Sequence, residues 1–272
     1  MVKVETLTVG KELLVGRTVN TNAHWVGGRM ARMGSMLRRV ATVDDDLDEI
    51  SSAIHEALAR SPDFIVVIGG LGPTPDDMTL KGIALGLQRR VKEDPRALEM
   101  VRRHYEQSRK RAGMTPARRK MAELPSGSVP LSNRVGTAPG VRIEEGETVI
   151  FALPGVPAEM KSIFRESVEP EISAKVGRLH RRQEVLHLKG AAESSLAPGI
   201  GSVMRMHPDA YIKSHPKGDE DGKSVVELDI TVVRRTVEEA VSEAEAIASQ
   251  LAAEAERAGA KVRRGPRGGG RA

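Results

Sequence analysis

Apolar and polar positions follow two alternating rhythms over residues 1–176. Short apolar, β-branched runs predict four strands, at Val2–Val9, Leu37–Val43, Asp63–Ile68 and Thr148–Leu153. Apolar residues at helical spacing predict helices between and after them, at Asn22–Met33, Leu47–Leu58, Thr79–Leu87 and Pro157–Val168. Strands that alternate with helices imply crossover connections, so we expect an α/β fold: a three-layer sandwich around a mostly parallel sheet.

Two Pro residues mark further helix starts in this region. Asp94 before Pro95 is typical of an N-cap followed by the first helical residue, and the helix that it opens is expected to reach about Arg111. The pair Thr115-Pro116 repeats the signal.

The pattern changes after residue 176 and predicts a second, smaller α+β domain over residues 183–262. The basic stretch Gly177–Arg182 is expected to be a linker. The order β-α-β-β-α is predicted from five segments, in which Pro198 weakens the first helix and His215–Lys223 forms a polar loop between the paired strands: Glu184–Leu188, Glu193–Met204, Ala210–Ser214, Ser224–Val233 and Val237–Ala258. The Arg- and Gly-rich end, Arg263–Ala272, is predicted to be a disordered basic tail.

Composition narrows the class of protein. The 272 residues include 42 Lys and Arg against 37 Asp and Glu, a formal net charge of +5, with 39% hydrophobic residues. These values are typical of a globular chain, and no apolar run approaches the ~20 residues that a membrane span needs. The chain has no Cys, which excludes thiol nucleophiles and thiolate metal sites and indicates a cytoplasmic protein. Three Phe, two Tyr and one Trp leave few stacking platforms for single-stranded nucleic acid.

Two glycine-bearing segments follow predicted strands and carry candidate chemistry. The first runs from Gly10-Lys11-Glu12 to Asn20-Thr21-Asn22, where one polar residue can cap the next helix. The second, Gly69-Gly70-Leu71-Gly72-Pro73-Thr74-Pro75-Asp76-Asp77-Met78-Thr79, has three Gly within four residues and lets backbone amides approach a phosphate. It lacks the Walker Gly-Lys-Ser/Thr element. One of its two Asp suffices as a helix cap, which leaves the other for a divalent cation.

Two more segments have the same character. Asn133 to Gly140, with Gly136 and Thr137, is a candidate loop over a ligand or an ordinary connection. Leu153-Pro154-Gly155-Val156-Pro157 again runs from a strand through Gly to a helix start that can bind phosphate. In Asp44-Asp45-Asp46, Asp45 or Asp46 is a candidate metal ligand, and one of them is equally a cap for the helix from Leu47. Ligands bind at the carboxyl ends of parallel strands, so these loops predict one nucleotide- or pterin-phosphate site.

The four segments, in this order, resemble the N-terminal domain of the competence/damage-inducible CinA family. That domain is similar to the molybdopterin-binding domains of molybdenum-cofactor biosynthesis proteins. Residues 183–262 resemble, more weakly, the KH-like domain that follows in the family. The resemblance implies a three-layer α/β fold and a homodimer or homotrimer. It also implies a hydrolase of pyrophosphate bonds in ADP-ribose- or FAD-like nucleotides, with a divalent cation and potassium. The family's C-terminal deamidase domain has no counterpart in this sequence, so deamidase activity is not expected.

The resulting hypothesis is metal-dependent hydrolysis of a dinucleotide pyrophosphate. Asp77, with Asp45 or Asp76, would hold Mg²⁺, Mn²⁺ or Co²⁺. Glu12 would act as a base or would orient the groups that bind the cation. The substrate would be bound by the remaining motif positions: Lys11, Asn20, Asn22, Gly69, Gly70, Gly72, Thr74, Thr79, Asn133, Gly136, Thr137, Pro154 and Gly155.

One departure and two alternatives stay open. The family usually has Asp or Asn where this chain has Lys11, which cannot ligate a cation but can bind a phosphate.

The first alternative is pterin-phosphate binding or adenylyl transfer of the molybdenum-cofactor type, which would use the same loops. The second is a non-catalytic nucleotide- or RNA-binding protein, suggested by Lys11, the KH-like region and the basic tail. Nucleic acid and membrane partners are not expected; a small-molecule nucleotide is.

Overall fold

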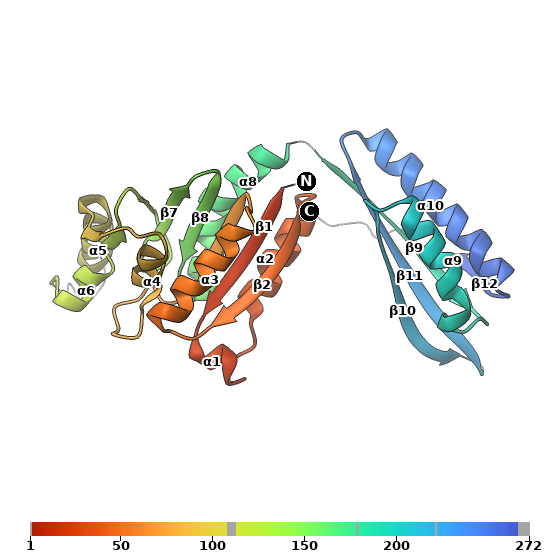
Figure 1. Cartoon of the computed structure of the whole chain (residues 1–272), viewed down its shortest axis with the longest axis horizontal. Coiled ribbons are helices and arrows are strands. Elements are labelled where there is room, and N and C mark those ends of the chain that lie inside the picture. The colour runs from red at the N-terminus through yellow and green to blue at the C-terminus, as the bar shows by residue number, and fades with distance from the viewer. Residues whose placement is uncertain (1, 108–112, 178, 221, 266–272) are drawn as a thin grey trace. The chain divides into compact units, whose positions relative to one another are not determined.

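The computed structural model describes residues 2–107, 113–177, 179–220 and 222–265. The chain divides into two compact units, Met1–Gly177 and Arg178–Ala272 (Figure 1). Each unit has its own sheet and its own hydrophobic core. Each is therefore described by itself.

The first unit is built on a six-stranded sheet in the order β2-β1-β3-β8-β7-β6. Its first four strands in that order pair in parallel, whereas β7 and β6 pair antiparallel at one side. The bounds are β1 Lys3–Val9, β2 Met36–Val43, β3 Phe64–Ile68, β6 Val129–Leu131, β7 Gly140–Glu145 and β8 Thr148–Leu153. The four predicted strands and the mostly parallel sheet are thus confirmed.

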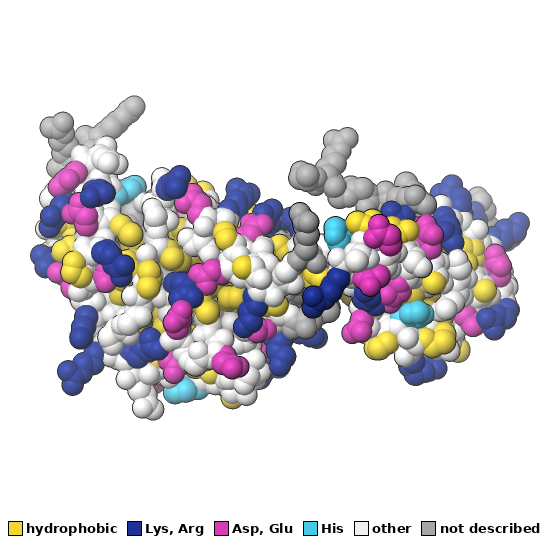
Figure 2. All heavy atoms as spheres, turned by 90° about the horizontal axis from the view of Figure 1, so that it is seen from above, with side chains coloured by type: hydrophobic (Ala, Val, Ile, Leu, Met, Phe, Trp, Pro, Cys, Tyr) yellow, Lys and Arg dark blue, Asp and Glu magenta, His cyan; other side chains and the backbone are white. Residues whose placement is uncertain are grey.

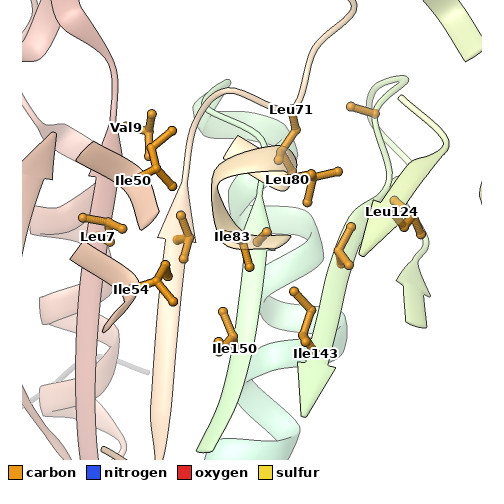
Figure 3. Packing of buried hydrophobic residues seen from close by; sticks show 14 of the residues in the cluster. Leu7, Val9, Ile50, Ile54, Leu71, Leu80, Ile83, Leu124, Ile143 and Ile150 are labelled. Atoms are coloured by element: carbon orange, nitrogen blue, oxygen red, sulfur yellow. The ribbon is translucent and has the colours of Figure 1, made fainter. Parts of the chain in front are cut away.

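Helices cover both faces of this sheet and complete a three-layer sandwich. One core cluster joins Leu7 and Ile150 of the sheet to Ile50 and Ile83 of the helices on that face, as Figure 3 shows. The opposite cluster packs Phe64 and its strand neighbours against the other helices. The bounds are α2 Thr21–Arg32, α3 Leu47–Ala59, α4 Thr79–Gly86, α5 Pro95–Gln107, α6 Pro116–Lys120, α7 Pro157–Ile163 and α8 Glu169–Val176.

Several short elements escape the sequence pattern. A four-residue helix, α1 Lys11–Leu14, follows β1, and a two-stranded sheet joins β4 Val91–Glu93 to β5 Glu123–Pro125. The helix predicted over Pro157–Val168 continues through a π-helical turn, Phe164–Val168, into α8. Pro170, in the first turn of α8, has no N–H to close the ordinary ladder, which accounts for the widened turn before it. The expected end of α5 near Arg111 lies outside the described residues.

The second unit is a four-stranded antiparallel sheet in the order β10-β11-β9-β12, with two helices packed on one face. The bounds are β9 His180–Lys189, α9 Glu193–Met206, β10 Tyr211–Glu220, β11 Lys223–Arg234, α10 Val237–Arg257 and β12 Lys261–Arg264. Leu228 and Ile230 of β11 and Ile247 and Leu251 of α10 belong to its core. The predicted α+β class is confirmed, and α9 forms despite Pro198.

Three local predictions in this unit are wrong because backbone pairing overrides polar composition. His180–Arg182, expected in a linker, begin β9 and pair with Arg234, Val233 and Val232. Most of the expected loop His215–Lys223 belongs to β10, where edge position and a bulge accommodate Pro216. Arg263 and Arg264, expected in the tail, form part of β12 against β9. Residues 266–272 lie outside the described residues. No helix in the described ranges is long and apolar enough to cross a membrane.

Candidate functional site

A pocket of about 280 Å³ opens where the parallel strands of the first unit end. Its walls come from the segments that follow β1, β2, β3 and β8. It is lined by Thr8, Val9, Gly10, Glu12, Leu13, Thr18, Val19, Asn20, Thr21, Asn22, Asp45, Ile68, Gly69, Gly70, Asp76, Asp77, Gly155 and Pro157. The carboxyl edge of a parallel sheet is where α/β proteins bind ligands, so this pocket is the candidate site.

Two glycines allow the loop after β3 to lie close to β1 and α4 at the pocket. Gly69 has φ +112°, and a Cβ there would lie 2.2 Å from the backbone oxygen of Val9. Gly70 has φ +64°, and its Cβ would lie 2.3 Å from Oγ1 of Thr79. Side chains at these positions would push β1 or α4 away, so the loop that follows β3 needs glycine at both positions to lie this close to them.

Four carboxylates share the pocket: Glu12, Asp45, Asp76 and Asp77. Burial raises the pKa of Asp45, and the negative charges of Glu12, Asp44 and Asp76 raise it further, against a lowering by the backbone N–H of Lys11. That N–H donates to Oδ2 of Asp45 at 2.9 Å. Burial and the neighbouring negative charges therefore disfavour the ionised form of Asp45, and a cation bound beside it would favour that form.

Asp76 and Asp77 are both placed by the turn that begins at Thr74. The backbone N and the hydroxyl of Thr74 donate to Oδ2 of Asp77 at 2.8 and 2.6 Å. The pKa of Asp76 lies below its ordinary value, first because the Thr74 hydroxyl, whose hydrogen bond goes to Asp77, also lies close to the Asp76 carboxylate, then because of its own backbone N–H and the charge of Lys120.

The three acidic residues before α3, Asp44–Asp46, have different roles. Asp46 is the N-cap of α3, because its side chain accepts hydrogen bonds from the backbone N of Asp48 and Glu49. Asp45 lines the pocket, and Asp44 forms an ion pair with Lys11 at 3.3 Å. Lys11 itself has a side chain that is 71% exposed and does not belong to the pocket lining.

The two asparagines before α2 are used differently. Asn20 caps α2 through Oδ1 and donates through Nδ2 to the hydroxyl of Thr8 at 2.9 Å. Asn22 donates to the backbone oxygen of Gly155 at 2.8 Å. Its Oδ1 is buried and has no hydrogen-bond partner among the described residues. Asn22 therefore offers the pocket an acceptor for a ligand N–H or O–H group.

The segment from Asn133 to Gly140 is hydrogen-bonded to α7 and does not line the pocket. Nδ2 of Asn133 donates to Glu159 at 2.6 Å and to the backbone oxygen of Ala138 at 2.8 Å. Glu159 lies so close to Gly136 that a Cβ there would come within 2.0 Å of its Cδ. Thr137 follows in the same loop. The pocket lining likewise omits Gly72, Thr74, Thr79 and Pro154, which are neighbours of lining residues.

Sequence reasoning missed part of the lining. Thr8 lies at the end of β1, Thr18 and Val19 lie between α1 and α2, and Thr21 is the first residue of α2. Their signal was only their position beside the Gly10 and Asn20 motifs, because isolated Thr and Val residues carry no chemical signature.

The carboxylates suit a divalent cation by chemistry, although no group of three potential ligands converges among the described residues. Mg²⁺ is commonly bound by one or two carboxylates together with substrate phosphates and water. One or two of the carboxylates Asp45, Asp76 and Asp77 would be enough for that mode, in which substrate and water complete the ligand set.

The fold and pocket define an α/β protein with a candidate ligand pocket at the carboxyl edge of its parallel strands. Residues 5–174 match the family model described as a probable molybdopterin binding domain, and the chain belongs to this family. The match ends before the second unit, so the KH-like resemblance of residues 183–262 stays a prediction.

The relatives extend over most of the chain. A protein of Pyrobaculum arsenaticum is 42% identical over 90% of this chain and 91% of its own length. One of Aeropyrum pernix is 43% identical over 88% of each. The crystal structure of a protein titled CinA, of unknown function, from Thermoplasma acidophilum is 42% identical, with a TM-score of 0.57. It covers 62% of this chain and 98% of that one. The chain is therefore CinA-like.

Proposed function

We propose that the pocket binds the diphosphate of a nucleotide such as ADP-ribose or FAD, and that the protein hydrolyses the bond between the two phosphates. The observation that carries this proposal is the shared pocket of four carboxylates and bare glycine backbone. Carboxylates repel a diphosphate unless a cation lies between them, so the two features are compatible only if a divalent cation accompanies the substrate.

Asp77, with Asp45 or Asp76, would hold Mg²⁺, Mn²⁺ or Co²⁺. Such a cation neutralises charge on phosphoryl oxygens and lowers the pKa of bound water. Gly70 and the start of α2 would hold the diphosphate through backbone N–H groups. Gly69 would leave room for the diphosphate by lacking a side chain, because its own N–H donates to the backbone oxygen of Leu153. Glu12, in the pocket wall, would accept the proton of the attacking water. The potassium ion implied by the family resemblance has no assigned ligands.

The nucleoside part of the substrate would lie near Asn22 and Val19. The unpartnered Oδ1 of Asn22 would accept a ribose hydroxyl or base N–H. Val19 is 80% exposed and offers an apolar contact at the pocket wall. Lys11 would bind a phosphate only after release from Asp44, and Asn133 would support the site through Glu159.

A second candidate function is the binding of a pterin phosphate, with or without adenylyl transfer. The specific observation in its favour is the family match over residues 5–174. It would use the same glycine loops and carboxylates. In either case a small molecule is the partner, and we infer assembly into a homodimer or homotrimer. The RNA-binding alternative gains little support, since basic and acidic side chains are interspersed on the face drawn in Figure 2.

The test is turnover of ADP-ribose and FAD by the purified protein with Mg²⁺, Mn²⁺ or Co²⁺. We expect release of AMP that falls to background in Asp77→Ala and by roughly 10²- to 10⁴-fold in Glu12→Gln. Asp48→Asn, which removes an exposed carboxylate in the first turn of α3, is the matched control and should keep full activity.

The alternative outcome is equally clear. If no cation supports release of AMP while a pterin phosphate binds saturably, the hydrolase proposal is wrong and the second candidate is favoured. Retention of AMP release in Asp77→Ala would instead show that the cation is not held at this carboxylate.

A further inference from the structure

The loop between β3 and α4 has two faces. Gly70 and Asp77 line the main pocket on one face and also line a small hollow on the other. The hollow has a volume of about 10 Å³, close to the space that one water molecule needs. Lys81, Lys120 and Glu123 also line it. Lys81, Lys120 and Glu123 therefore lie beside the back of the loop.

Lys120 makes a direct contact with the loop from this hollow. Its Nζ donates a hydrogen bond to the backbone oxygen of Thr74. Thr74 also donates through its backbone N and its hydroxyl to Oδ2 of Asp77. The turn is therefore held at both ends, by the carboxylate of Asp77 at the front and by the ammonium of Lys120 at the back.

The backbone of Lys120 is held in place by α6 and by the buried residues that follow it. It is the last residue of α6, which is capped by the hydroxyl of Thr115. Met121 and Ala122 follow it directly, Leu124 comes two residues later, and all three belong to the buried core. The side chain therefore needs to order only its own rotamers to reach Thr74.

The contact also affects the carboxylate at the site. Both hydrogen bonds that the Asp77 side chain accepts from described residues go to Oδ2. Oδ1 of Asp77 accepts no hydrogen bond from a described residue. If the Thr74 turn loosened, Asp77 would lose both donors together, and its carboxylate would become free to rotate.

We propose that Lys120 is a positioning residue that holds the Thr74 turn in place and thereby orients Asp77 toward the pocket. The part of this inference that concerns cation binding rests on the proposed function. The part that concerns the turn does not, because it describes the ligand-free protein. Lys120 does not line the pocket, so it acts through Thr74 and Asp77.

The matched variants are Lys120→Met, Lys120→Arg and Lys81→Met. Lys120→Met keeps much of the apolar stem and removes the charge, whereas Lys120→Arg keeps a donor. Lys81 lines the same hollow but pairs with Glu123, at 3.6 Å, so Lys81→Met is the control for loss of a cation. Thermal unfolding of each variant checks that the fold is intact.

The first readout is hydrogen exchange of the Thr74 amide in the ligand-free full chain. A hydrogen bond from a charged donor at a partly exposed site predicts about tenfold faster exchange in Lys120→Met. Lys120→Arg should restore protection, and Lys81→Met should leave it unchanged. Equal protection in Lys120→Met and the wild type, or equal loss in Lys81→Met, would overturn the proposal.

The second readout is Mn²⁺ binding, with the metal alone as the probe. We expect Lys120→Met to weaken it about tenfold and Lys120→Arg to restore most of the affinity. If exchange changes as expected but wild-type protein binds no Mn²⁺, the turn is positioned by Lys120 and the metal-dependent function is wrong. If wild type and Lys120→Met bind Mn²⁺ equally, the link from Lys120 to Asp77 is wrong.

Discussion

At the scale of single residues, the site depends on the close approach of Gly69 to β1. The backbone N of Gly69 donates to the oxygen of Leu153 in β8 at 3.0 Å, while its Cα lies against Val9. Gly69 thus connects three parallel strands at the point where the pocket begins. A side chain there would meet backbone on one side and have no rotamer that avoids it.

We expect Gly69→Ala to destabilise the protein by about 3 kcal/mol and to disrupt the pocket. A left-handed φ costs a non-glycine residue roughly 1–2 kcal/mol, and forced overlap with packed atoms adds about 1–3 kcal/mol. Gly146→Ala is the matched control, because Gly146 also has positive φ, at +57°, but a Cβ there meets nothing within 4 Å. Urea unfolding should give that variant only the first cost. Equal losses in the two variants would contradict the steric argument.

At the scale of elements, the sequence predicts what depends on hydrophobic burial. The run Phe64–Ile68 is buried at every position, so its pattern identifies a central strand. The helical spacing of Ile50 and Ile54 identifies α3 in the same way. Elements held by backbone pairing or by a few polar contacts escape such reasoning. β10 is mostly exposed, and α1 has no buried residue.

The sequence also predicts only part of the candidate site. The glycine- and aspartate-bearing loops were predictable, because strand ends in a parallel sheet meet at one edge. The direction in which each side chain points was not. The side-chain amide of Asn20 donates a hydrogen bond to Thr8, and that of Asn133 donates one to Glu159. Both partners are distant in sequence, and only the tertiary fold brings them near.

Asp63 shows how one side chain can connect several elements. It precedes β3, and its carboxylate accepts hydrogen bonds from the backbone N of Lys3, in β1, at 2.6 Å. It also pairs with Lys175, in α8, at 2.7 Å. Burial alone would raise the pKa of Asp63, but the hydrogen bonds from Lys175 and Lys3 outweigh it, so the pKa is lowered.

Asp63→Asn should therefore lower the free energy of unfolding at neutral pH by about 1 kcal/mol, a value reduced by the partial exposure of Lys175. A carboxyl whose pKa is lower in the folded state stabilises the protein fully above the unfolded value of about 3.9. The contribution disappears as pH falls through the lower folded value. Urea unfolding at pH 7, 5, 4 and 3 should show the difference between variant and wild type shrinking only in the acid range.

Glu147→Gln, in the exposed turn between β7 and β8, is the control for loss of a surface carboxylate. Its unfolding free energy should follow that of the wild type at every pH. A difference between Asp63→Asn and wild type that stayed constant down to pH 3 would show that the charge of Asp63 is not the source of its contribution.

At the scale of the whole molecule, the pocket and the second unit use separate parts of the chain. All residues that line the pocket lie between Thr8 and Pro157, and both clusters that cover the large sheet end at Ile172 or before. The core of the second unit begins at Leu186. The last helix of the first unit, α8, ends at Val176 before Gly177, whose φ of +76° suits a helix end.

We therefore expect residues 1–177, produced alone, to fold cooperatively and to bind Mn²⁺ as tightly as the full chain, within about twofold. The physical reason is that truncation at Gly177 removes no residue from the pocket, and none from the two clusters that enclose the six-stranded sheet. Near-UV circular dichroism around Trp25, the chain's one tryptophan, reports on packing, because the indole contacts Phe164 edge-on within the first unit. A fragment that kept this signal but lost Mn²⁺ binding would assign the second unit a part in the site, and an unfolded fragment would show that the first unit depends on the second for stability.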